Sequence, residues 1–244
     1  MKEWITGRNP VYEVLAAGKR DIFQLKIASG AKVEGKLAEI IALAKKRKIT
    51  PVMVQRFELD RLDENHQGVA AEVSGYSYCD LTDIEQKAEA AQEQLFILVL
   101  DTLQNPQNLG TLIRTAEAAG VHGIIIPLAH TVAVTPAVVH SSVGATEHML
   151  ICQMNLSQAF DELHDRGTWI VGLEGGPEAT PIDVNKLTGN LAIVVGSEGE
   201  GLRKLTRQKC DELSALPMKG KIESLNAAVA GSIVIYLSRL QRDK

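Results

Sequence analysis

Residues 95–110 read LFILVLDTLQNPQNLG, and they give the clearest indication of the fold class. Its first six residues, all apolar, are typical of a strand buried on both faces of a parallel sheet. A polar segment containing Pro106 follows, and apolar residues then recur with helical spacing over 109–119. A buried strand, a polar loop and a helix in this order predict one unit of an α/β domain.

Strand and helix patterns alternate on both sides of this unit. Toward the C-terminus, strands are predicted over residues 123–126, 149–153, 169–173 and 191–195, and helices over 156–165 and 224–239. Toward the N-terminus, a smaller α/β module is predicted from strands over 22–28, 51–54 and 68–73 and a helix over 33–48. We therefore expect a small N-terminal domain over 1–75, an acidic linker with one helix over 76–94, and a mostly parallel α/β domain over 95–244.

The composition excludes several classes of protein. Apolar residues make up 45% of the 244 residues and aromatic residues 4%, which is enough for an aliphatic core. No apolar run reaches the roughly 18–20 residues of a membrane span, and the first residues lack the apolar core of a signal peptide. The three cysteines lie far apart, and the histidines have no metal-ligand spacing. We expect a cytoplasmic protein with reduced thiols, no metal site and no membrane segment.

Charge is distributed unevenly along the chain. The formal net charge is −4, yet the first fifty residues hold 11 Lys or Arg against 5 Asp or Glu. A basic face on an N-terminal module suits the phosphate backbone of a nucleic acid. Part of this excess, residues 45–48, is equally typical of the solvated C-terminal end of a helix. Charge alone leaves both interpretations open.

Three unusual loops follow predicted strands of the C-terminal domain, where open α/β sheets bind their ligands. In the first, residues 101–110, Asn108 is placed to cap the next helix, and Arg114 lies less than two turns further on. In the third, residues 216–226, Ser224 is a candidate N-cap and Asn226 would lie in the first helical turn. Each of these two loops, taken alone, is explained equally well by helix capping.

The second loop, VGSEGEGL at residues 195–202, holds three glycines in six residues after a predicted buried strand. Glycine lets the backbone approach a ligand closely. No Gly-Lys-Ser/Thr follows and no G-x-G-x-x-G opens a helix, so the loop matches neither the P-loop nor the dinucleotide fingerprint. The sequence therefore disfavours an ATP-binding or NAD-binding enzyme.

Taken together and in this order, the three loops resemble the motifs of the SpoU/TrmH-type RNA 2′-O-ribose methyltransferases of the SPOUT superfamily. The matching segments are NPQNLG at 105–110 with Arg114, VGSEGEGL at 195–202, LPM at 216–218 and SLNAA at 224–228. GRNPV at 7–11 and HQGV at 66–69 resemble the small ribosomal-protein-like RNA-binding domain attached to some members. With this attached domain, the chain is most similar to the bacterial 23S rRNA guanosine-2′-O-methyltransferases.

The resemblance implies a fold and partners that the residue patterns alone do not predict. It implies a SPOUT α/β-knot, with a deep trefoil knot in the C-terminal domain, which is an exception to the usual topology rules. It also implies a homodimer with its active site near the knot and the dimer interface, S-adenosyl-L-methionine as the cofactor, and RNA as the substrate. The attached domain favours rRNA over tRNA, with guanosine as the expected nucleoside.

The resemblance also implies which residues form the site. The expected catalytic residues are Arg114, Asn108, Ser224, Asn226 and Glu198. Because arginine side chains stay protonated, we expect Arg114 to bind the adjacent phosphate and stabilise charge on the 2′-oxygen rather than act as a base. The expected cofactor-binding residues are Leu173, Gly175, Gly196, Ser197, Glu198, Gly199, Gly201, Leu216, Met218, Ser224, Leu225 and Ala227.

Three alternatives stay open at this point. An enzyme of the same fold would methylate a tRNA ribose. A non-catalytic RNA-binding protein of the same fold would be expected to have lost Arg114, Asn108 or the Ser224 and Asn226 pair, all of which are present. An unrelated nucleotide-binding α/β enzyme is disfavoured by the missing P-loop and dinucleotide fingerprints.

Overall fold

The computed structural model describes residues 2–176, 178–197 and 199–244. These residues form two compact units, and each unit draws on two separate stretches of the chain. The first unit holds residues up to 77 together with 133–148, and the second holds 78–132 together with 149–244. No described helix is long and apolar enough to span a bilayer.

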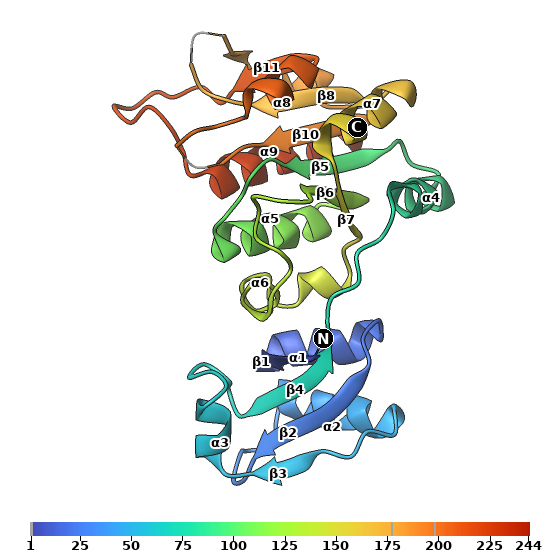
Figure 1. Ribbon diagram of the computed structural model, residues 1–244, viewed down its shortest axis with the longest axis vertical. Coiled ribbons are helices and arrows are strands. Elements are labelled where there is room, and N and C mark those ends of the chain that lie inside the picture. The colour runs from blue at the N-terminus through green and yellow to red at the C-terminus, as the bar shows by residue number, and fades with distance from the viewer. Residues whose placement is uncertain (1, 177, 198) are drawn as a thin grey trace. The chain divides into compact units, whose positions relative to one another are not determined.

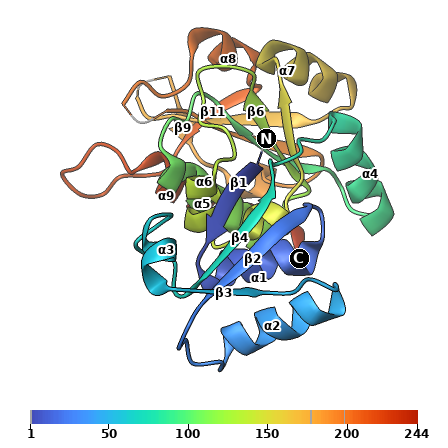
Figure 2. The ribbon, with the colours of Figure 1, turned by 60° about the horizontal axis from the view of Figure 1, so that its bottom comes forward.

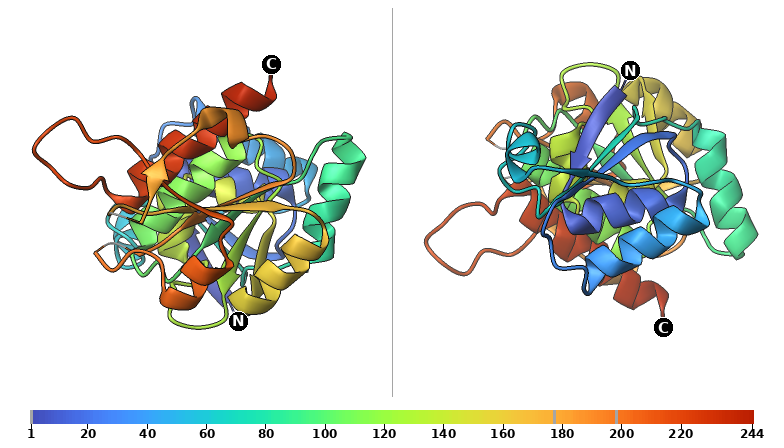
Figure 3. Two further views of the ribbon diagram at one scale, coloured as in Figure 1. Left: turned by 90° about the horizontal axis from the view of Figure 1, so that it is seen from above. Right: turned by 90° about the horizontal axis from the view of Figure 1, so that it is seen from below.

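The first unit is built on a four-stranded sheet in the order β1-β4-β2-β3, with the strands side by side in Figure 2. β4 pairs antiparallel with β1 and β2, and β2 pairs parallel with β3. The strands are β1 (Lys2–Thr6), β2 (Ile22–Ala28), β3 (Val52–Val54) and β4 (Val69–Ser74). The helices are α1 (Arg8–Ala17), α2 (Lys36–Lys46), α3 (Arg56–Asp60), α6 (Pro136–Ser141) and the short 3-10 helix η1 (Ala145–Glu147). α1 and α2 pack against each other, as the right-hand view of Figure 3 shows.

The segment 133–148 joins this unit from far along the chain. Its helix α6 packs on β1, and its 3-10 helix η1 packs on α1. Gly144, between them, has a left-handed φ of 87°, and a Cβ there would lie 2.7 Å from the Cβ of Glu13. The close approach of the segment to α1 therefore requires glycine at this position.

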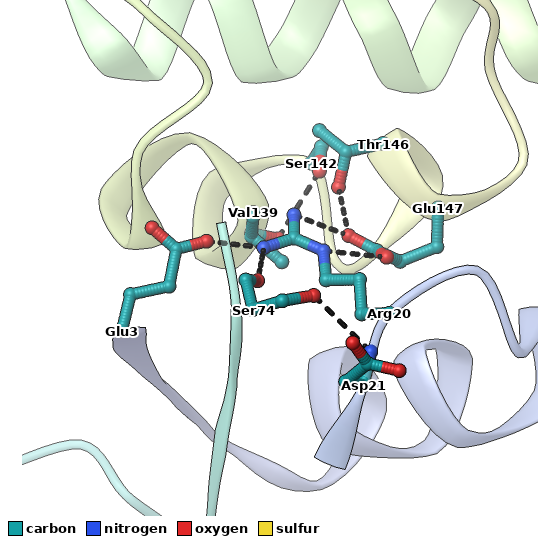
Figure 4. A network of polar contacts seen from close by, with 8 residues as sticks. All are labelled: Glu3, Arg20, Asp21, Ser74, Val139, Ser142, Thr146 and Glu147. Carbon is teal, nitrogen blue, oxygen red and sulfur yellow. Dashed lines mark hydrogen bonds and ion pairs between the residues drawn. The ribbon is translucent and has the colours of Figure 1, made fainter. Parts of the chain in front are cut away.

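A buried ion pair fastens the same segment to the first unit (Figure 4). The Arg20 guanidinium donates hydrogen bonds to both carboxylate oxygens of Glu147, at 2.9 and 2.8 Å. It also donates to the Glu3 carboxylate and to the Ser74 carbonyl oxygen. A buried guanidinium is tolerated when it is paired and hydrogen-bonded in this way, whereas losing one partner leaves a buried charge uncompensated.

The second unit is a seven-stranded sheet in the order β7-β6-β5-β10-β8-β11-β9, and its neighbouring strands pair in parallel. Its strands are β5 (Phe96–Leu100), β6 (Gly123–Pro127), β7 (Ile151–Met154), β8 (Trp169–Leu173), β9 (Thr180–Pro181), β10 (Leu191–Val195) and β11 (Glu212–Ala215). Its helices are α4 (Leu81–Ala91), α5 (Pro106–Ala118), α7 (Leu156–Asp165), α8 (Lys204–Lys209), α9 (Ala227–Arg242) and the 3-10 helix η2 (Val184–Lys186). α5 and α9 pack together on one face of the sheet, and α4 and α7 cover the other (Figure 1). The mostly parallel α/β sheet predicted from the sequence is confirmed, and the trefoil knot stays a prediction.

The central strands are the continuous apolar runs of the sequence. All residues of β5 and β10 are buried. Ile97 and Val99 face the cluster under α4 and α7, so the residues between them face the opposite helical layer. Because both faces are covered, these strands show no alternation of polar and apolar residues.

Helix α5 starts earlier than the sequence predicted. It begins at Pro106, and its N-cap is Asn105, whose side chain accepts a hydrogen bond from the Gln107 N–H at 2.8 Å. The prediction that Asn108 caps this helix is wrong. Proline favours the first helical position, because its fixed φ suits the helix and its missing N–H is not needed there.

Helix α9 starts later than predicted. It begins at Ala227, and its N-cap is Asn226, whose side-chain oxygen accepts hydrogen bonds from the N–H groups of Ala228 at 2.9 Å and Val229 at 3.2 Å. The prediction that Ser224 caps the helix is therefore wrong. Asn226 satisfies two of the unpaired N–H groups of the first turn, which leaves Ser224 in the preceding loop.

Candidate active site

The loops that follow β5, β8 and β10 leave the sheet of the second unit at one edge. Val195, at the end of β10, pairs in register with Leu100 of β5 and with Leu173 of β8. Because the strands are parallel, their carboxyl ends lie level and the loops that follow them start side by side. This edge is where open α/β sheets bind ligands.

The loop after β10 is a tight hairpin. Ser197 and Gly201 exchange two backbone hydrogen bonds of 3.1 Å each. A Cβ on Gly196 would lie 2.4 Å from the Gly201 carbonyl oxygen, and Gly199 and Gly201 have left-handed φ values of 87° and 70°. A side chain would clash at the first position and strain the backbone at the other two. The three glycines of the sequence motif are thus explained by the shape of the hairpin.

A cavity of about 650 Å³ opens beside this hairpin, between the loops after β8, β10 and β11 and the start of α9. Eleven of the residues predicted to bind the cofactor line it, namely Leu173, Gly175, Gly196, Ser197, Gly199, Gly201, Leu216, Met218, Ser224, Leu225 and Ala227. Glu198, the twelfth, lies outside the described residues. The loop that carries Met218 and Ser224 reaches away from the sheet on the left of Figure 3. The structure therefore gathers these residues around one cavity, and their role in binding a cofactor stays a prediction.

An ion pair that the sequence reading missed lies in the same cavity. Glu174, directly after β8, exposes 8% of its side chain and pairs with Arg207 of α8. The hydrogen bond that Arg207 donates to the Glu174 carboxylate raises the pKa of the Arg207 guanidinium above its ordinary value. The signal available in the sequence was an acidic residue placed between a buried strand and two glycines, Gly175 and Gly176.

A second cavity, of about 530 Å³, adjoins the first and shares Ser197 and Glu200 with it. Its lining is mostly polar and consists of Thr102, Leu103, Gln104, Asn105, Asn108, His130, Ser197, Glu200 and Arg203. The hairpin after β10 therefore separates two cavities at one edge of the sheet.

Two of the predicted catalytic residues meet in space. Asn108, which is buried in the first turn of α5, lines the second cavity. Its side-chain oxygen accepts a hydrogen bond of 3.3 Å from the Asn226 amide. Asn226 is in turn the N-cap of α9, so the contact ties the starts of the two helices together. Ser224, two residues earlier, lines the first cavity.

Arg114 lies apart from this group. It is exposed on α5, lines neither cavity, and makes no ion pair with the residues that the structure describes. A separation of six residues from Asn108 turns the helix by about 240°, so the two side chains leave it in different directions. The neighbouring Thr115 contacts Ser232 of α9 at 3.0 Å between hydroxyl oxygens, so this turn of α5 packs against α9.

The thiols do not form a nucleophilic site. Cys79, Cys152 and Cys210 are all free. Burial raises the pKa of Cys79 to about 12, of Cys152 to about 11 and of Cys210 to about 12. Thiols with such values are protonated at neutral pH. Among the described residues, no group of His, Cys, Asp and Glu has an arrangement that would hold a metal ion.

Family models match both parts of the chain. The model of the SpoU rRNA methylase family matches residues 95–236, more than half of the chain. The chain belongs to the SpoU rRNA methylase family. A second model, described as RNA 2′-O ribose methyltransferase substrate binding, matches residues 4–79 of this SpoU chain. The family inferred from the order of the three loops is confirmed.

Relatives match the SpoU chain over nearly its whole length. It is 41% identical over 238 residues to the putative TrmH family tRNA/rRNA methyltransferase YacO of Bacillus subtilis (strain 168), covering 96% of this chain and 94% of that protein. It is 39% identical over 234 residues to a putative TrmH family tRNA/rRNA methyltransferase of Staphylococcus aureus (strain COL), covering 95% and 93%.

Solved structures share the fold of the SpoU chain. The SpoU methyltransferase AviRb from Streptomyces viridochromogenes, in complex with AdoMet, superposes with a TM-score of 0.80 at 23% identity, covering 98% of this chain and 90% of that one. The AdoMet-bound rRNA methyltransferase from Sinorhizobium meliloti superposes with a TM-score of 0.78 at 22% identity, covering 98% and 87%. At these sequence identities, the structural similarity shows only that the N-terminal and C-terminal parts of the chain have the same folds as those proteins.

Proposed function

We propose that the chain is an RNA 2′-O-ribose methyltransferase that takes its methyl group from S-adenosyl-L-methionine. The observation that carries the proposal is the pair of cavities that adjoin at Ser197 and Glu200. A methyl transfer needs a donor site and an acceptor site in contact, so that the reacting atoms are held together. The descriptions of the relatives as methyltransferases, and the AdoMet in AviRb, support the same assignment.

The first cavity fits the cofactor. Its volume of about 650 Å³ suits a nucleoside-sized ligand. Leu173, Leu216 and Leu225 line it with apolar side chains suited to the adenine, and the glycine hairpin brings backbone groups close. The bound cofactor supplies a methyl group on a positively charged sulfur. The protein has to position that group and exclude water from it.

The second cavity would hold the acceptor nucleotide. To accept the methyl group, the ribose 2′-hydroxyl would have to give up its proton to solvent, and the cofactor would supply the methyl group with a neutral thioether as the leaving group. Asn108 places its side-chain amide at this cavity, where it would orient the ribose, and Asn226 supports it by donating a hydrogen bond to its oxygen. Glu198, also expected to be catalytic, lies outside the described residues. Arg114 stabilises charge on the 2′-oxygen and binds the adjacent phosphate.

We propose further that the enzyme is a homodimer and that Arg114 serves the partner subunit's cavities. Four apolar residues recur with helical spacing on the outer face of α9 and are 39–62% exposed, namely Val229, Ile233, Tyr236 and Leu240. A second copy of α9 would cover this stripe. Arg114 precedes Thr115, which contacts Ser232 of α9, and it lines neither cavity of its own chain, so a subunit contact over α9 would bring it to the partner's site.

The N-terminal unit favours rRNA as the substrate, with guanosine as the nucleoside. A model of the substrate-binding part of RNA 2′-O-ribose methyltransferases matches residues 4–79, and a basic N-terminal module suits an RNA backbone. A tRNA ribose is the second candidate, because the relatives are described as tRNA/rRNA methyltransferases.

Mapping of ribose methylation across rRNA and tRNA, in strains with and without this protein, tests the function. We expect one ribose in 23S rRNA to lose its 2′-O-methyl group in the deletion strain and to regain it when the gene is restored. Purified protein should transfer a radiolabelled methyl group from S-adenosyl-L-methionine to the same nucleotide. Loss of a tRNA methyl group would favour the second candidate, and unchanged maps with no transfer in vitro would contradict the proposal.

A further inference from the structure

One arginine of the second cavity is held in place by a buried carboxylate. Asp101, directly after β5, is fully buried. Its two oxygens accept hydrogen bonds from the backbone N–H of Arg203 at 3.0 Å and from its Nε at 2.6 Å. The two residues are 102 positions apart, so this contact joins the loop after β5 to the loop after β10. The contact fixes the position of the Arg203 backbone and of the Nε end of its guanidinium.

The outer part of the same guanidinium is available to a ligand. Arg203 exposes 47% of its side chain and lines the second cavity. Of its five N–H donors, Asp101 takes only the one on Nε. The two terminal nitrogens, which carry the other four, make no hydrogen bond or ion pair with the residues that the structure describes. A planar group with paired donors matches the geometry of a phosphate.

We propose that Arg203 binds a second backbone phosphate, on the other side of the methylated ribose from the one assigned to Arg114, and so positions the RNA strand in the second cavity. This inference rests on the proposed function, because it takes the second cavity as the acceptor site. Asp101 acts through Arg203 by holding it still, so that little side-chain entropy is lost when the phosphate binds.

The charges around the cavity orient the strand. Glu200, an exposed carboxylate, lines both cavities and repels a phosphate. The phosphate therefore lies at the Arg203 end, and the ribose lies toward Glu200 and Ser197, where the two cavities adjoin. Lys204 is the next cation along the chain but lines neither cavity, which makes it a matched control.

The experiment measures binding of the full-length protein to a 23S rRNA transcript at several salt concentrations, for the wild type, Arg203→Met, Arg203→Lys and Lys204→Met. Removing one charge-assisted phosphate contact should weaken RNA binding about 10- to 100-fold and reduce the slope of log affinity against log salt by about 1. Arg203→Lys should restore the slope and part of the affinity. Lys204→Met should leave both near the wild type.

Two further measurements separate this role from a structural one. The affinity for S-adenosyl-L-methionine, measured by calorimetry, should be unchanged in Arg203→Met, since Arg203 does not line the first cavity. If Arg203→Met unfolds, the double variant Asp101→Asn/Arg203→Gln removes both charges and leaves no buried carboxylate unpaired; it should show the same loss of slope. Wild-type affinity and slope in a folded Arg203 variant would overturn the phosphate site alone. Arg203-dependent RNA binding without methyl transfer by the wild type would support the phosphate site and contradict the proposed function.

Discussion

Two buried carboxylates of this protein each hold an arginine, and the two pairs differ in what the arginine faces. In the first unit, Glu147 and Arg20 expose 1% and 3% of their side chains. In the second unit, Asp101 is buried to the same degree, but Arg203 is half exposed. Arg20 donates hydrogen bonds to Glu147, Glu3 and Ser74, whereas Arg203 lines a cavity and donates to Asp101 from Nε alone among its side-chain nitrogens, as far as the described residues show.

The difference shows how the same pair of residue types acquires two roles. A guanidinium closed in on all sides holds two pieces of chain together, and in the first unit these are the N-terminal sheet and the segment 133–148. A guanidinium that is hydrogen-bonded only through Nε is held in position, and its terminal N–H groups can still bind an anion. Burial of the arginine end, rather than of the carboxylate end, distinguishes the two cases.

The largest effect is expected from Arg20→Met. The variant leaves the Glu147 carboxylate buried without its cation, and breaking a buried pair in this way costs about 3–5 kcal/mol of unfolding free energy. Urea unfolding followed by circular dichroism measures this loss. Lys36→Met is the control, because it removes a cation from an exposed pair with Glu39 and from the face of the Tyr12 ring, and it should lower the unfolding midpoint far less. Equal midpoints for the two variants would contradict the structural role of Arg20.

The thiols extend the comparison to weakly acidic groups that are wholly or partly buried, with Cys152 buried and Cys79 and Cys210 half-buried. Burial raises the pKa of Cys79 from 9.0 to about 12, which lowers its thiolate fraction, and hence its alkylation rate at pH 8, about 1,000-fold. Because the unfolded thiols ionise near pH 9 and the folded ones do not, unfolding releases protons above that pH, and the unfolding free energy should fall as the pH rises from 9 to 11. Alkylation rates in native buffer and in urea measure the difference, and rapid labelling of the native protein would contradict it.

Arg114 extends the comparison to an arginine that no described carboxylate holds. If the partner subunit's site uses it, Arg114→Ala should lower the methyl-transfer rate by about 100-fold or more, with cofactor binding unchanged. In mixed dimers with Asn108→Ala, one site keeps both wild-type residues when Arg114 acts across the interface, so part of the activity should return. Turnover near the wild-type rate for Arg114→Ala would contradict its catalytic role, and no recovery in the mixed dimer would contradict the shared site.

The smallest effect is expected from Asp101→Asn, which keeps the side-chain shape but removes one acceptor for Arg203. RNA binding should weaken about 3- to 10-fold, less than in Arg203→Met, and the unfolding free energy should fall by about 1–3 kcal/mol. Asp165→Asn, an exposed change at the end of α7, is the control and should alter neither quantity. A change in cofactor affinity as large as the change in RNA affinity would show that Asp101 supports the first cavity instead.

Local patterns predicted part of the fold well. The predicted bounds of β2, α7, β8 and β10 agree with the structure because these elements have clear apolar periods or runs. β1 and α1 were missed: Gly7, at the N-cap of α1, makes no side-chain cap, so the usual start signal is absent. The starts of α5 and α9 were misplaced because each loop holds several residues that are able to cap a helix, and only the backbone path selects one.

The α/β class, the order of the three loops and the family could be read from the amino-acid sequence, because they depend on runs and motifs that lie within short stretches of chain. Three features depend on the folded chain: residues 133–148 pack with the first unit, eleven of the residues predicted to bind the cofactor line one cavity, and Asp101 holds Arg203. These contacts join residues up to 127 positions apart. Their geometry depends on how strands and helices pack, which no local pattern specifies.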